Sequence, residues 1–197
     1  MSIELTTVST DYAVLHDGET KTVLDTLQPD TDYQCQGIEF RTLPSLGKEL
    51  SRFTTVNDVH FGEAICGVTN TPNQGPTYKS PANDPHPEFM SRAAVEEMQQ
   101  VKPDAVLVKG DLTTKGTQAE FQLFLDCYHS AFNENLYYVT GNHDAYRDEP
   151  IHSQTSSRID LNGVTLAMID TVRPGLTGGT CYDRDIDWLD ELAQSTT

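Results

Sequence analysis

The chain has 197 residues, and its 13 basic and 30 acidic side chains give a net charge of −17. A chain of this length is typical of one domain of ordinary size with at most a small extra segment, which excludes two large domains. The acidic excess argues against a nucleic-acid-binding protein, because the polyanion would be repelled.

Residues 1–47 are predicted to form a small antiparallel β segment. Short runs rich in Thr, Val and Tyr, such as 12–15 and 22–24, are broken by turn residues, and only three or four strands fit. The stretch 27–33 resembles the end of a fibronectin-type-III-like sandwich, in which Tyr33 packs back onto a Leu-x-Pro turn. We therefore expect about half of such a sandwich, followed by a linker near Pro44.

From Ser51 onward, predicted strands alternate with predicted helices, which indicates an α/β architecture in residues 51–197. The closing helix is expected to place Trp188, Leu189 and Leu192 in the core. The expected elements, in chain order, are a strand 52–60, a helix 88–102 between two prolines, a buried strand 105–108, a helix 118–129, a strand 136–139, a hairpin 158–170 and a helix 185–194.

Three polar sequences stand where three successive predicted strands end: Asp58-Val59-His60, Gly110-Asp111 and Gly141-Asn142-His143-Asp144. Ligands of α/β sheets bind in the crevice outside the carboxyl ends of the strands, so these sequences are expected to converge. Each one alone is a weak signal, since an Asp-x-His is more often a chance surface pair and a Gly-Asp is usually a turn. Together, they indicate a metal site with oxygen and imidazole ligands.

The residue types suggest a division of roles. Alternation along a strand would let Asp58 and His60 bind one cation together. Asp111 follows a buried strand, where a carboxylate is costly unless it is paired or metal-bound, and its two oxygens can bridge two cations. Asn142 offers a neutral carbonyl oxygen, and the adjacent His143 is available as a proton donor.

The order and spacing of these motifs resemble the calcineurin-like metallophosphoesterase superfamily, from about Arg52 to the C-terminus. Within it, residues 162–189 resemble the class III cyclic-nucleotide phosphodiesterase branch. The N-terminal β segment is similar to that of purple acid phosphatases. Those enzymes, however, carry a Tyr three residues after the Gly-Asp aspartate, where this chain has Thr114, so a purple iron centre is not expected.

The resemblance implies an αββα sandwich that hydrolyses a phosphoester by means of a hydroxide activated between two metal ions, and the resemblance to the phosphodiesterase branch favours a phosphodiester. The metals are expected to be manganese or iron, with zinc as a further option. The resemblance assigns the residues as follows: Asp58 and His60 bind the first metal, Asp111 bridges, Asn142 binds the second, His143 assists the leaving group and Asp144 orients His143. Apart from the resemblance, Arg147, three residues after Asp144, is a candidate to bind a substrate phosphate, and a surface salt bridge is the alternative.

Two features depart from the family pattern. A later lone His and a Gly-His-x-His motif are absent after Trp188 and Leu189, so the domain 51–197 is expected to lack its C-terminal part and three His ligands. The sandwich is then incomplete, and this polypeptide alone is expected to be weakly active or inactive. The alternative is a non-catalytic protein-binding module on a phosphoesterase scaffold, against which the intact first motifs argue.

The sequence gives only general indications of the protein's partners and cellular compartment. No apolar run approaches a membrane span, and the first residues carry no signal sequence, so a cytoplasmic location is expected. The four cysteines form no Cys-x-x-Cys pair and are interpreted as ordinary thiols. The expected partner is a small phosphoester substrate, which the sequence does not identify further, and the oligomeric state is not predicted.

Overall fold

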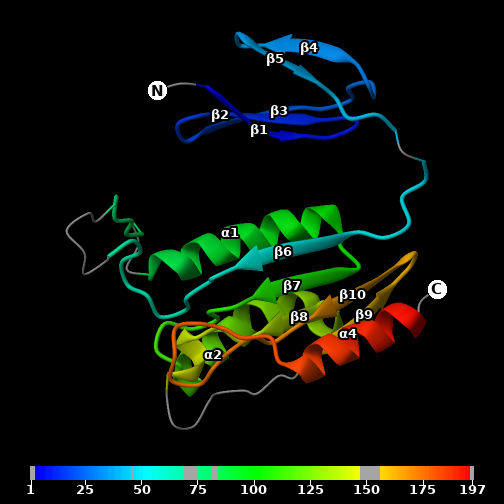
Figure 1. The fold of residues 1–197 in the computed structure, drawn as a ribbon. Helices are drawn as coiled ribbons and strands as arrows, with labels where there is room; N and C mark the ends of the chain where they lie inside the picture. Colours follow the sequence, from blue (N-terminus) through cyan, green and yellow to red (C-terminus); the bar gives the residue numbers. More distant parts are fainter. Residues whose placement is uncertain (1–2, 46, 69–74, 81–83, 147–155, 196–197) are drawn as a thin grey trace. The chain divides into compact units, whose positions relative to one another are not determined.

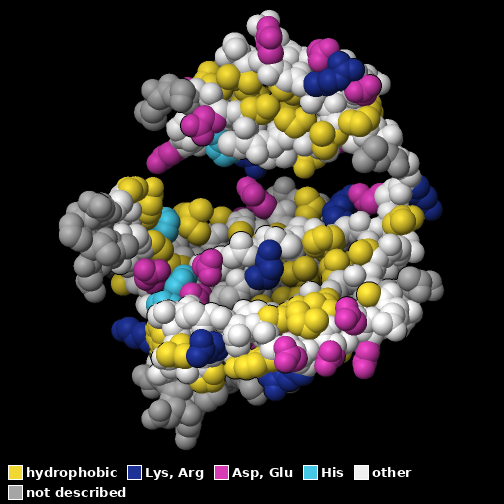
Figure 2. Space-filling model, viewed as in Figure 1, with side chains coloured by type: hydrophobic (Ala, Val, Ile, Leu, Met, Phe, Trp, Pro, Cys, Tyr) yellow, Lys and Arg dark blue, Asp and Glu magenta, His cyan; other side chains and the backbone are white. Residues whose placement is uncertain are grey.

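A computed structural model describes residues 3–45, 47–68, 75–80, 84–146 and 156–195 of the chain. The chain divides into two compact units, Met1–Glu49 and Leu50–Thr197, which are described separately (Figure 1). In the described ranges, no helix combines the length and the apolar character needed to cross a membrane. Acidic side chains are scattered over the face seen in Figure 2, and basic side chains form no continuous patch there.

The first unit is all β. Strands β1 (Glu4–Val8), β2 (Ala13–Asp17) and β3 (Thr20–Leu24) form an antiparallel sheet, and β4 (Asp32–Cys35) and β5 (Ile38–Arg41) form a hairpin. The described part thus has five strands rather than the three or four predicted, because β4 and β5 have only four residues each, too short for their alternation of polar and apolar residues to be a strong signal.

One contact of this unit was expected from the sequence. The backbone N–H of Gln28, in the Leu-x-Pro turn, donates to the Tyr33 hydroxyl at 2.7 Å, and the Tyr33 ring stacks on Phe40 at 5.8 Å between centroids. The likeness of the whole unit to half of a fibronectin-type-III sandwich stays a prediction.

The second unit is built on a parallel sheet in the order β6-β7-β8, formed by Phe53–Asn57, Ala105–Lys109 and Leu136–Val139. The central strand β7 is apolar and buried from Ala105 to Val108, as expected for a parallel strand covered on both faces. The predicted α/β architecture is therefore confirmed.

Different secondary-structure elements pack on the two faces of the sheet. On one face, helices α1 (His86–Val101) and α2 (Gln118–Phe124) and the π-helical turn η1 (Leu125–His129) pack over Val106 and Val108. On the other face, the hairpin of β9 (Ser157–Leu161) and β10 (Val164–Met168) packs over Ala105, Leu107 and Val139. Short turns α3 (Ser130–Phe132), η2 (Asn133–Asn135) and η3 (His143–Ala145) complete the connections.

The last helix, α4 (Asp183–Ser195), lies beside the hairpin in Figure 1, and Arg158 of β9 donates to the Ser195 hydroxyl at 3.5 Å. The layers of this unit are thus helices, parallel sheet, hairpin and helix, as expected for the αββα order. Trp188, Leu189 and Leu192 are only half-buried, because α4 has a cover on one side alone, so their predicted place in the core is wrong.

Helix α1 begins near the predicted position, and its buried face is not formed by its largest apolar residues. Pro87 lies in its first turn, as expected, whereas Phe89 and Met90 are 41% and 49% exposed. The buried face carries Glu88 and Val95 instead. Burial of Glu88 is stabilised because its Oε1 accepts a hydrogen bond from the backbone N–H of Gly62, in the loop that follows β6.

Candidate functional site

The carboxyl ends of β6, β7 and β8 meet at one edge of the sheet, and the candidate residues lie in the loops that follow. Strand β6 ends at Asn57, so Asp58 and His60 are loop residues, and the strand alternation expected to pair them does not apply. Asp58, His60 and Asp111 have φ values of 50°, 42° and 38°. Left-handed backbone is uncommon in residues other than glycine, although Asp and His adopt it more often than most, and it clusters at functional sites.

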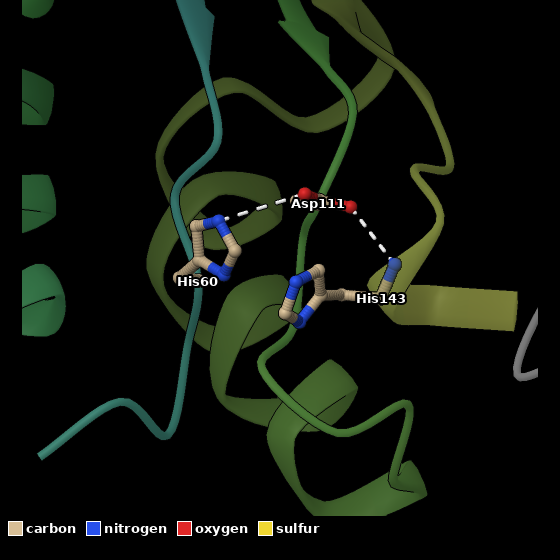
Figure 3. A group of neighbouring side chains, drawn as sticks. All are labelled: His60, Asp111 and His143. Carbon is tan, nitrogen blue, oxygen red and sulfur yellow. Dashed lines mark hydrogen bonds and ion pairs between the residues drawn. The ribbon is translucent and has the colours of Figure 1, made fainter. Parts of the chain in front are cut away.

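Figure 3 shows that His60, Asp111 and His143 come together from three of these loops. Each offers one metal-ligand atom, and the atoms lie within 4.8 Å of one another. The His60 Nε2 lies 3.6 Å from Asp111 Oδ2, and Asp111 Oδ1 accepts a 2.9 Å hydrogen bond from the backbone N–H of His143. The two imidazole rings meet edge to face, with centroids 4.8 Å apart.

The tautomer of His143 is set by Thr114. The Nδ1 atom of His143 lies 2.8 Å from the Thr114 carbonyl oxygen, which can only accept, so Nδ1 carries the hydrogen. This leaves Nε2 as the ring nitrogen available for chemistry. The Thr114 hydroxyl also donates to the His60 carbonyl at 3.0 Å, so one threonine links the loops that carry both histidines.

Asp144 follows His143 in the chain and is 1% exposed. Its Oδ1 accepts from the backbone N–H and the hydroxyl of Thr113 at 2.8 and 2.6 Å, and its Oδ2 accepts from the N–H groups of Leu112 and Gly141 at 2.9 and 2.7 Å. These bonds fasten the loop after β7 to the loop after β8. Among the described contacts, the Asp144 carboxylate bonds to these groups rather than to the His143 ring.

Two glycines allow the loops to approach. A Cβ added to Gly141 would overlap the backbone nitrogen and Oδ1 of Asp111, so Gly141 makes room for that carboxylate. The sequence analysis did not foresee this close approach. Gly110 has a φ of 76° and lies beneath Asp58, whose Oδ1 would be 3.7 Å from an added Cβ. These two residues therefore bring Asp58 and Asp111 to the same edge of the sheet.

The Asn142 side chain donates from Nδ2 to the Tyr146 hydroxyl at 2.6 Å, and the Tyr146 ring packs against His143 with centroids 4.8 Å apart. The predicted substrate residue Arg147 lies outside the described residues. Sequence reasoning did not identify Tyr146 or the linking role of Thr114, because both act through contacts across loops that leave no spacing signal.

A cleft of about 510 Å³ opens beside the site. Asp58, Asp111 and Asn142 line it, together with the end of β10 and the segment 171–179. Asp111 therefore faces both the cleft and the histidine cluster. Asp58 and Asn142 belong to the cleft rather than to the tight group of His60, Asp111 and His143.

The donor set fits divalent metal ions. The His60 Nδ1 is buried without a hydrogen-bond partner among the described residues, so the site holds a ligand atom that the protein itself does not satisfy. Carboxylate, imidazole and amide oxygen are ligands for manganese, iron and zinc. A thiol is a poor candidate nucleophile nearby, because burial and the charge of Glu63 raise the pKa of Cys66 to about 11.

Comparisons with known proteins agree with this geometry. The model of the calcineurin-like phosphoesterase family matches residues 51–190. A probable cyclic nucleotide phosphodiesterase of Rhodococcus erythropolis is 29% identical to the chain over 104 residues, which are 47% of this chain and 35% of that protein. The matched part thus spans about a third of the length of this curated relative.

Proposed function

The chain belongs to the calcineurin-like phosphoesterase family, and from this premise we propose that it is a metal-dependent phosphodiesterase. The observation that carries the proposal is the convergence of His60, Asp111 and His143 from three strand-end loops. The relative named as a probable cyclic nucleotide phosphodiesterase supports a diester rather than a monoester as substrate.

In this proposal, Asp58 and His60 would hold one divalent ion and Asn142 a second, and Asp111 would be shared between the two. When bound, two such ions would neutralise charge on the phosphoryl oxygens and make water a stronger nucleophile. Manganese and iron are the preferred candidates, with zinc as a further one. Asp144 acts as a positioning residue, since its carboxylate fixes the loops that carry Asp111 and His143.

His143 is assigned to the leaving group. Its Nδ1 is held by the Thr114 carbonyl, so Nε2 is the atom that would exchange a proton with the departing oxygen. Tyr146 supports this role, because its ring packs on His143 while its hydroxyl holds the Asn142 amide. Arg147 is proposed to contact the substrate phosphate.

The test is hydrolysis of bis(p-nitrophenyl) phosphate by the whole chain after chelation and after reloading with manganese. Because three His ligands are expected to be missing from this chain, we expect turnover to be slow and to occur only in the loaded protein. In Asp111→Asn and His143→Ala this slow rate should fall by about 10²-fold or more, since proton transfer by a positioned side chain contributes about 10² to 10⁴. Metal content is measured in parallel and is expected to fall in Asp111→Asn but not in His143→Ala.

His129→Ala is the matched control, because His129 is exposed and lies on η1, outside the cluster. This variant should keep full turnover. Turnover that survives chelation, or a loaded chain that retains metal without hydrolysing any phosphodiester, would contradict the proposal. The second result would favour a binding module on the same scaffold.

A further inference from the structure

The cleft beside the site carries positive charge as well as the candidate metal ligands. Among the described residues that line it, the acids are Asp58 and Asp111, and the cations are Lys109 and Arg173. We propose that Lys109 and Arg173 form an anion subsite, and that the substrate is a phosphoester bearing a second anionic group. This inference rests on the proposed function and names the class of substrate for the same site.

The position of Lys109 follows from the strand. It is the last residue of β7, and side chains alternate along a strand, so Lys109 faces the same side as Leu107, which packs on the hairpin face. Both residues line the cleft. Lys109 is exposed, and no described acid forms an ion pair with it, so its ammonium group is available to a ligand.

Arg173 comes from the segment after β10, which is fastened to the site. The Thr140 hydroxyl donates to Asp170 Oδ2 at 3.2 Å, and the N–H of Gly175 donates to the carbonyl of Ala145, beside Asp144, at 3.1 Å. The segment is also closed on itself, since the N–H of Thr180 donates to the carbonyl of Thr171 at 2.8 Å.

These bonds hold the backbone of Arg173 in a fixed place on the cleft wall. Its side chain is exposed, and no described acid forms an ion pair with it. A guanidinium on this wall can bind carboxylate or phosphate oxygens through two parallel hydrogen bonds.

The charges define the substrate class. Asp58 and Asp111 would be balanced by divalent ions, and the scissile phosphodiester contributes one negative charge at those ions. Lys109 and Arg173 remain without a balancing acid among the described cleft residues. A second anionic group on the substrate would supply the balancing negative charge. Because the protein has a net charge of −17, a local cationic pair also offsets the repulsion of an anionic substrate.

The subsite is tested with p-nitrophenyl phosphodiesters that share the leaving group and differ in the retained alcohol, which is ethyl, 2-carboxyethyl or 2-phosphoethyl. The manganese-loaded whole chain should have a kcat/KM about fivefold to tenfold higher for the charged esters than for the ethyl ester, the range expected for a charge-assisted pair at an exposed site. In Lys109→Ala and Arg173→Ala this ratio should fall toward one. The carboxylate and phosphate arms identify which anion is preferred.

Arg184→Ala is the matched control, because Arg184 is an exposed arginine on α4 that lies over Tyr182 and does not line the cleft. It should keep the full ratio. Equal kcat/KM for all three esters, or a preference that survives both cleft substitutions, would overturn the subsite.

A second readout does not depend on catalysis. Equilibrium dialysis of the same esters against the slow His143→Ala variant should retain the charged esters more strongly, and adding Arg173→Ala should abolish the difference. If no ester is hydrolysed, the proposed function fails, and dialysis still decides the subsite. Equal retention of charged and uncharged esters overturns it.

Discussion

Asp144 shows how a single buried carboxylate can organise two loops. It accepts hydrogen bonds from backbone N–H groups of Leu112, Thr113 and Gly141, and from the Thr113 hydroxyl. We expect Asp144→Asn to lower the free energy of unfolding by about 3 kcal/mol, because the amide nitrogen would face N–H donors and leave them buried and unpaired. Urea unfolding followed by the fluorescence of Trp188 measures this loss.

The matched control is Asp126→Asn, since Asp126 is an exposed carboxylate that accepts a hydrogen bond from Gln122. This substitution should change the unfolding midpoint little. If Asp144→Asn were equally mild, the buried carboxylate would not be what holds the two loops, and its role would have to be sought nearer to His143.

At the scale of the elements, the close packing of the loops after β7 and β8 depends on Gly141. A methyl group there would overlap the backbone nitrogen and Oδ1 of Asp111. We expect Gly141→Ala to destabilise the chain by about 1–3 kcal/mol, as overpacking does, and to weaken manganese binding because Asp111 must move. Urea unfolding and equilibrium dialysis of manganese measure the two effects.

Gly178→Ala provides the comparison, because Gly178 also lines the cleft but an added Cβ would meet nothing within 4 Å. It should leave both stability and manganese binding nearly unchanged. Should Gly141→Ala bind manganese like the parent chain, the position of Asp111 over Gly141 would be irrelevant to the metal ligands.

The sequence predicted the elements better than the contacts between them. Apolar runs and turn residues were enough for β7 and for the β9–β10 hairpin, since both signals are local. The buried face of α1 was not predictable, because it includes Glu88, whose burial depends on a hydrogen bond from the backbone N–H of Gly62 in a loop distant in sequence.

The same limit applies to the site. Its motifs follow strand ends and could be predicted from their positions along the chain, as the cluster of His60, Asp111 and His143 illustrates. The link through Thr114 and the contact of Tyr146 with Asn142 could not, because they depend on how separate loops pack.

For the whole molecule, the dominant feature is a net charge of −17, which opposes compaction by self-repulsion. Sodium chloride screens exposed charges, with a Debye length of about 10 Å at 0.1 M, so the thermal midpoint should rise with salt. Manganese at the same ionic strength should raise it further, because an ion at about 100 times its Kd adds about 2.7 kcal/mol, or roughly 5–10 °C for a unit of this size. Chelation should reverse only the rise in midpoint caused by manganese.

The two contributions separate in the variant Asp111→Asn. General screening acts on acids spread over the surface, so this variant should respond to sodium chloride like the parent chain. Stabilisation by bound manganese needs the Asp111 carboxylate at the strand ends, so the additional rise in midpoint caused by manganese should vanish in this variant. Fluorescence of Trp188, the single tryptophan, reports melting of the unit that holds the site, because it lies on α4. If manganese raised the thermal midpoint equally in both proteins, surface acids would be binding the ion, and the strand-end loops would not form the metal centre.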